Sequence, residues 1–208
     1  MDNVKSLDPL QLDTKEVHKI LLSSVAPRPI AFASTVDLKG NVNLSPFSYF
    51  NVFSSNPPIL IFSPSRRVRD NTTKHTLENA KETKEVVINM VNYSIVEQMS
   101  QTSREYDKGV NEFVETGLTE VPSLKVKPPR VLESPISFEC TVDNIVSLGE
   151  SGGAGQLIIA KVIQIHINKD YLDTEGNIDS EKLELVARMG GDWYTKANKE
   201  SMFKIPKP

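Results

Sequence analysis

Residues 41–58, NVNLSPFSYFNVFSSNPP, carry the pattern that decides how this chain folds. Val42 and Leu44 alternate with polar residues, as in a strand with one buried face. After Pro46 the large apolar residues fall on odd positions instead of even ones. Because the two faces of a strand alternate with a period of two, this change of phase predicts a bend or bulge near Pro46. We therefore expect one long, bent strand here.

The composition of this bent strand permits two interpretations. Proline removes one hydrogen-bond donor from a strand ladder, which leaves a partner carbonyl free. Together with small Ser and Asn side chains, such an edge can offer donors and acceptors to a flat polar ligand. Alternatively, the stretch is a plain edge strand in which Pro46 blocks edge-to-edge aggregation. The residues of this stretch alone leave both interpretations open.

The rest of the chain reads as strands at hairpin spacing with a few short helices. A capping-box start at Asp13 and Glu16 predicts a short amphipathic helix over 13–25, with Val17, Ile20, Leu21 and Ser24 on one face. Further strands are predicted at 29–36, 57–65, 85–91, 134–148 and 155–167, helices near 73–84, 94–103 and 180–185, and an irregular excursion over 104–130. A parallel α/β sheet would need a helix after nearly every strand. The fold class is therefore expected to be mainly β, a closed antiparallel barrel of about six strands.

The bulk composition is that of a single globular domain over residues 1–208. Hydrophobic residues make up 38% of the chain and charged residues 25%, values typical of soluble domains. The formal net charge of −3 argues against a general binder of nucleic acid or of anionic membranes, because both need excess cations. No stretch approaches the roughly 20 apolar residues of a membrane span, so no membrane partner is expected.

Cysteine and histidine usage excludes two further classes of site. Cys140 is the only cysteine, so neither an intrachain disulfide nor a cysteine-built zinc site can form. With one cysteine and no secretory h-region, a cytoplasmic location is expected. The three histidines, His18, His75 and His166, are too scattered along the chain to indicate a metal site. His166 is expected to be packed or hydrogen-bonded, and Cys140 to be a small buried residue.

A basic segment, SPSRRVRDNTTKHTLEN (63–79), stands out in this acidic chain. It places arginines, a lysine and hydroxyl groups at a predicted junction between a strand and a helix. Arginine forks and helix N-terminal amides together favour a phosphate site. A solvated basic loop is the alternative reading, and this segment alone does not decide between them.

Taken in order, several segments resemble the flavin reductase-like family, whose members have the FMN-binding split-barrel fold. The resemblance rests on PRPIAFASTVDLKGNVNLSPFSYFN, IFSPSR, TTKHTLEN, VNEFVETGL, KPPRVLESPISFEC, GGAGQLIIAKVIQIHI and ARMGGDWY. It runs from about Val17 to Ala197, which is nearly the whole chain. It implies a six-stranded antiparallel barrel of Greek-key topology, a homodimer, and non-covalent FMN near the dimer interface.

The resemblance also implies a set of cofactor-binding residues. Asn43, Leu44 and Ser45 would line the pyrimidine edge of the flavin, with backbone N–H groups around Ser45 as donors. The other ring and ribityl contacts would come from Ser34, Thr35, Ser48 and Phe50. The family's phosphate segment commonly reads Lys-Asp-Thr, and here it reads Lys74-His75-Thr76. Lys74 and Thr76 would bind the phosphate with help from Ser63 and Arg67, whereas the role of His75 stays open. Arg188 and Tyr194 are expected either to pack near the flavin or to form a structural turn.

The function implied is an FMN-dependent oxidoreductase that uses NADH or NADPH to reduce flavin or another small acceptor. Because the isoalloxazine performs the redox chemistry, no separate catalytic acid–base set is expected. The alternative is a flavin-binding module or electron carrier that is reduced only by a partner protein. A third reading, less favoured by PRPIAF and SPFSYFN, is a split-barrel enzyme of the pyridoxamine-phosphate oxidase type.

Overall fold

A computed structural model describes residues 3–207 of the chain. Seven antiparallel strands form the main sheet, in the order β2-β1-β5-β8-β9-β4-β3. Their bounds are β1 Ala31–Val36, β2 Val42–Phe47, β3 Phe50–Ser55, β4 Pro58–Phe62, β5 Glu85–Asn89, β8 Ile136–Ser147 and β9 Gln156–Ile167. Two short ribbons stand apart from this sheet, β6 Glu120–Val121 with β7 Arg130–Val131, and β10 Val186–Arg188 with β11 Tyr194–Lys196.

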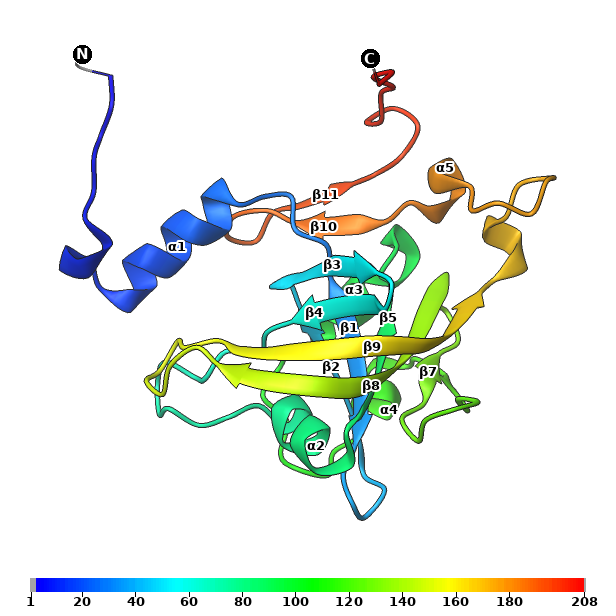
Figure 1. The fold of residues 1–208 in the computed structure, drawn as a ribbon, viewed down its shortest axis with the longest axis horizontal. Helices are drawn as coiled ribbons and strands as arrows, with labels where there is room; N and C mark the ends of the chain where they lie inside the picture. The colour runs from blue at the N-terminus through cyan, green and yellow to red at the C-terminus, as the bar shows by residue number, and fades with distance from the viewer. Residues whose placement is uncertain (1–2, 208) are drawn as a thin grey trace.

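The predicted mainly-β antiparallel class is confirmed, but the prediction of about six strands in a closed barrel is wrong. The stretch expected to be one bent strand is divided at Ser48 and Tyr49 into β2 and β3. These two strands are the opposite edges of the sheet. Since only two residues join them, the sheet must curl until its edges meet at this corner (Figure 1). No ladder joins β2 to β3 among the described residues, so the curled sheet stays open.

The helices of the protein are short. They are η1 Pro9–Gln11, α1 Thr14–Ser24, α2 His75–Thr83, η2 Tyr93–Ile95, α3 Val96–Gln101, α4 Glu112–Thr116, η3 Lys169–Tyr171 and α5 Ser180–Leu183. None of the described helices is both long enough and apolar enough to cross a membrane.

Helix α1 begins as predicted but packs differently. Asp13 and Glu16 form the expected capping box, each accepting a hydrogen bond from the other's backbone N–H. Its apolar face is not buried, however, since no residue of α1 is buried and Leu21 is 48% exposed. Figure 1 shows the reason for this exposure: α1 projects from the curled sheet next to β10 and β11 instead of lying across it.

Strand β1 separates two apolar cores. Ala31 and Ala33 pack into one core with Leu77 of α2, whereas Phe32 packs into the other with Met99 of α3. All six residues of β1 are consequently buried, which explains why AFASTV shows no alternation of polar and apolar residues. This double burial fixes β1, and β1 in turn holds the edge strand β2.

Candidate functional site

The outer edge of β2 is the scaffold of the candidate site. The N–H of Leu44 points away from β1, because it donates to Glu112 Oε2 at 2.9 Å. Since backbone groups of successive strand residues point in opposite directions, the N–H of Ser45 points toward β1. Pro46 shares the outward direction of Leu44 and pairs with Phe32 in the register. Its missing N–H therefore costs no bond with β1, and the expected free partner carbonyl does not arise.

The outward edge of β2 thus presents acceptors more than donors. The carbonyl groups of Leu44 and Pro46 face outward, and neither accepts a backbone hydrogen bond from any described residue. Leu44 is fully buried and lines neither cleft, whereas Pro46 lines the second cleft described below. The one outward amide, that of Leu44, is already bonded to Glu112. Two adjoining clefts open along this edge, and Ser103 lines both of them.

The first cleft, here called the basic cleft, lies beside the start of β2 and the start of α2. Its free volume is about 30 Å³. It is lined by Asn43, Ser45, Arg67, Lys74, His75, Thr76, Thr102, Ser103, Arg104, Glu105, Tyr106 and Glu112. The fold therefore brings together five of the predicted binding residues, which come from three separate segments of the sequence.

Lys74 is one of the cations that line the basic cleft, together with Arg67 and Arg104. Its ammonium makes no ion pair or hydrogen bond with any residue in the described range 3–207. Burial, and then the Arg67 guanidinium nearby, lower the pKa of Lys74. Arg67 itself is fixed, because its Nη1 donates to Thr72 Oγ1 at 2.9 Å and to the carbonyl of Thr73 at 2.5 Å. Two cations are thus held close together at one end of β2.

The N-terminus of α2 faces the same cleft. Lys74 is the N-cap residue, and no side chain caps this helix. The backbone N–H groups of His75 and Thr76 consequently stay available for an anion. The Thr76 hydroxyl accepts from Asn43 Nδ2 at 2.9 Å, which ties the helix to β2. Two cations and a helix N-terminus form a donor set that suits a phosphate group.

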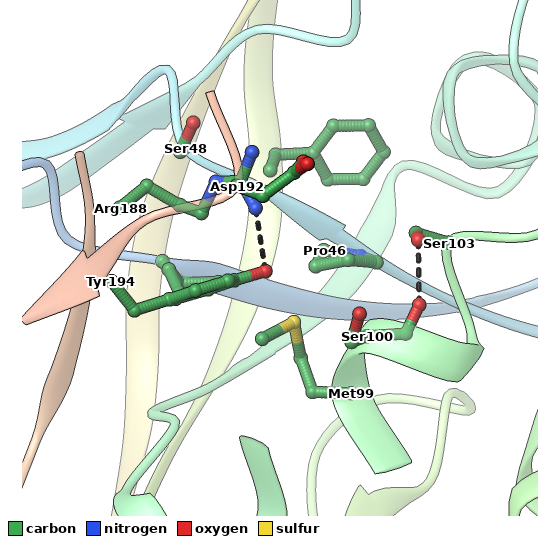
Figure 2. A pocket seen from close by; sticks show the side chains of 10 residues that line it. Pro46, Ser48, Met99, Ser100, Ser103, Arg188, Asp192 and Tyr194 are labelled. Carbon is green, nitrogen blue, oxygen red and sulfur yellow. Dashed lines mark hydrogen bonds between the residues drawn. The ribbon is translucent and has the colours of Figure 1, made fainter. Parts of the chain in front are cut away.

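The second cleft, here called the open cleft, lies beside the end of β2 and has a volume of about 360 Å³. It is lined by Ile30, Pro46, Phe47, Ser48, Met99, Ser100, Ser103, Arg188, Asp192 and Tyr194. Figure 2 shows Arg188 and Tyr194 from the β10–β11 ribbon facing Pro46 across the cleft, with Met99 and Ser100 on α3 below. The volume falls within the range of small-molecule sites.

Arg188 is held rigidly at the wall of the open cleft. Its Nη1 donates to the Tyr194 hydroxyl at 2.6 Å and its Nη2 to the Gly191 carbonyl at 2.8 Å. Its guanidinium also lies 4.6 Å from the centre of the Tyr194 ring. Behind this wall the buried Arg28 donates to the Met189 carbonyl at 3.0 Å and lies 3.4 Å from Ser48 Oγ. The RMGG segment is therefore a structural turn that also lines the open cleft, and its packing near a flavin stays a prediction.

Several predicted residues lie outside both clefts. Ser34 and Thr35 are completely buried, where Ser34 donates to the Pro129 carbonyl and Thr35 accepts from Asn79. Phe50 packs against the core cluster. Ser63 is buried close to Gly155, and its hydroxyl has no hydrogen-bond partner among the described residues.

The side chains of Cys140 and His166 are placed as predicted. Cys140 is fully buried, and burial raises the pKa of its thiol far above the ordinary value. His166 Nε2 lies 2.6 Å from Glu139 Oε1, so this histidine is hydrogen-bonded. Neither residue lines the clefts described above.

One side of the site comes from residues 99–112, none of which is among the binding residues predicted from the sequence. Thr102, Ser103 and Glu105 follow α3 and line the basic cleft because α3 packs on β2, and Ser103 also lines the open cleft. Glu112 is 5% exposed, and burial raises the pKa of its carboxyl although the Leu44 N–H opposes this shift. Its signal in the sequence is the segment VNEFVETGL, one of those that resemble the flavin reductase-like family.

Comparison with known proteins supports the resemblance seen in the sequence. A family model described as flavin reductase like domain matches residues 22–182. An uncharacterized protein of Aquifex aeolicus is 38% identical over 195 residues, which cover 94% of this chain and 97% of that one.

Solved structures agree with this match. Component B of nitrilotriacetate monooxygenase from Bacillus cereus is similar, with a TM-score of 0.90 at 29% identity, covering 99% of this chain and all of that one. A protein with a split barrel domain from Shewanella frigidimarina, assigned as a flavin reductase, has a TM-score of 0.78 at 30% identity, with 96% of each chain covered. The chain therefore belongs to the flavin reductase-like family.

Proposed function

We propose that the protein binds FMN non-covalently along the outer edge of β2 and works as an FMN-dependent oxidoreductase. The phosphate would occupy the basic cleft and the isoalloxazine the open cleft. The observation that carries this proposal is the arrangement of the two clefts. Both lie along the edge of β2 and share Ser103 as a lining residue. The basic cleft lies at the start of α2, and the larger open cleft lies beside Pro46. An elongated ligand with an anionic tail matches this arrangement.

The phosphate end is supported by Lys74, Arg67 and the first amides of α2. A half-buried ammonium without a protein partner is unfavourable unless an anion completes it. Direct contacts are proposed for the predicted residues that line the clefts, namely Asn43, Ser45, Ser48, Arg67, Lys74 and Thr76. Ser34, Thr35, Phe50 and Ser63 would act from behind, by holding β1, β3 and β4 in place. The buried Leu44 would hold the edge of β2 through its N–H bond to Glu112.

The proposed place of the isoalloxazine ring is supported by an acceptor and by a cation in the open cleft. The outward carbonyl group of Pro46, which lines the open cleft, can accept from the imide N–H of a flavin. This role differs from that of the amide donors expected around Ser45. Bound FMN would supply hydride and electron transfer. The protein's part is to orient the ring and to place the fixed Arg188 guanidinium in the same cleft. A cation there favours the negative charge that reduced flavin carries.

The activity proposed is reduction of the flavin, or of another small acceptor, by NADH or NADPH. The test is to identify by mass the yellow ligand released on heating, and then to follow bleaching of the bound flavin by each nicotinamide in an anaerobic stopped-flow instrument. Reduction within seconds by one nicotinamide supports the oxidoreductase. Tight FMN with no reduction by either nicotinamide would favour an electron carrier, and no affinity for flavin would overturn the proposal.

We also propose that the protein is a cytoplasmic homodimer with the flavin near the interface. Support comes from the edge strand β3, where Val52 is 63% and Phe53 is 65% exposed, and from the exposed Leu21 on α1. Light scattering after gel filtration tests this assembly, and a monomeric mass at micromolar concentration would contradict it. The acceptor would be a small molecule or a partner oxidoreductase that takes up reduced flavin.

A further inference from the structure

Glu105 brings a negative charge to the cleft assigned to the phosphate. Its Oε2 lies 2.9 Å from Arg69 Nη1, and its Oε1 lies 3.7 Å from Arg67 Nε. Arg69 first, through a hydrogen bond, and then the nearby charges of Arg67 and Lys74 lower the pKa of Glu105, so the carboxyl is ionised at neutral pH. The protein therefore places its own anion against the cations that would bind the cofactor.

We propose that Glu105 competes with the FMN phosphate for these cations and so keeps the cofactor exchangeable. Glu105 would thereby set how strongly the protein prefers FMN to riboflavin, which has no phosphate. The inference rests on the proposed function, because it assumes that the phosphate enters the basic cleft.

The size of the cleft supports direct competition. The cleft is narrow, with a volume of about 30 Å³, and Glu105 is one of the residues that line it. The side chains of Asn43 and Thr76 are hydrogen-bonded to each other. The cations of the cleft are the groups that would bind the phosphate. Glu105, by contrast, comes from the loop after α3, and its side chain is 56% exposed. Its carboxylate can therefore leave the cleft at little cost.

The strength of the ion pairs supports reversible competition. Arg69 is 68% exposed and also pairs with Asp70 at 2.9 Å, and pairs this exposed contribute little free energy. Arg67 is the inner cation, with a side chain that is only 19% exposed. A dianionic phosphate can displace Glu105 from Arg67 while Glu105 keeps Arg69. The cofactor still binds, but with lower affinity than in a cleft without the carboxylate.

The test compares Glu105→Gln with the unchanged protein, using FMN and riboflavin as separate probes. Glutamine keeps the size of the side chain and removes its charge. We expect the Kd for FMN to fall about fivefold and the Kd for riboflavin to stay the same, as measured by flavin fluorescence on the flavin-free full-length protein. A salt concentration of 0.5 M should reduce the difference in FMN Kd between Glu105→Gln and the unchanged protein, because salt screens exposed charges.

The control is Glu82→Gln, which changes net charge equally at the far end of α2. Glu82 is exposed and lines neither cleft, so both Kd values should stay unchanged. An unchanged FMN Kd in Glu105→Gln, or equal changes for both flavins, would overturn this inference alone. If the unchanged protein bound neither flavin, the proposed function would fail with it.

Discussion

Replacing Lys74 with alanine should weaken FMN binding about 10- to 100-fold while leaving riboflavin binding unchanged. The ammonium of Lys74 lies in the basic cleft and makes no ion pair among residues 3–207, so it is available to a phosphate. A hydrogen bond between charged groups contributes about 1.5–3 kcal/mol, which corresponds to the stated loss in affinity. Riboflavin should be unaffected, because it offers this lysine no anion.

The fold of the Lys74→Ala variant should survive. Burial and Arg67 lower the pKa of Lys74, which means that the folded state binds this proton less tightly than the unfolded chain does. The charge therefore opposes folding at pH values below the ordinary pKa of 10.5. Removing it should leave the melting temperature unchanged or slightly higher.

The assay is a fluorescence titration of flavin-free protein with each flavin in turn. Lys81→Ala serves as the control, because Lys81 lies exposed in the last turn of the same helix. The reasoning is refuted if Lys74→Ala binds FMN as tightly as the unchanged protein does, or if both flavins are weakened equally.

Three further predictions concern stability and redox behaviour. Burial raises the pKa of the Glu112 carboxyl in the folded protein. The protonated carboxyl therefore contributes fully to folding stability below its ordinary pKa of 4.5, and this contribution is lost as the pH rises through the raised pKa of the folded state. Glu112→Gln should thus gain stability relative to the unchanged protein between pH 4 and pH 7 in urea unfolding, and a difference independent of pH would contradict this. Phe62, fully buried and 5.5 Å from the Phe47 ring, should lose about 3–5 kcal/mol on change to alanine, and a loss below about 1 kcal/mol in the same assay would refute its core role. Arg188→Gln should lower the flavin midpoint potential by on the order of 20–30 mV, equivalent to about 1 kcal/mol, and an unchanged potential in a redox titration would remove Arg188 from the flavin environment.

Local signals in the sequence predicted the elements of the fold well. The capping box at Asp13 and Glu16 formed as expected, because both partners lie within one helical turn. The two long strands with clear alternation were found as β8 and β9. The division of the bent strand was missed, because a change of phase at Pro46 marks a bend equally well inside one strand or at a corner between two. Only the pairing of β3 with β4 and of β2 with β1 decides it.

The candidate site was predictable where a motif carries it and not where packing creates it. Lys74 and Thr76 follow one another closely at a helix start, so the sequence itself places them together. Glu105 and Glu112 reach β2 through the packing of α3 and α4, which no local pattern encodes. The sequence also did not show the direction of the backbone groups. The Leu44 N–H points outward to Glu112, so the N–H of the next residue, Ser45, points toward β1 and not toward a ligand.

A crystal structure of the protein with FMN tests the central claim most directly. We predict the phosphate within hydrogen-bonding distance of Lys74 Nζ and of the first amides of α2, with the isoalloxazine beside Pro46 and Arg188 in the open cleft. A phosphate bound away from the start of α2, or a ring that does not touch the edge of β2, would contradict the account.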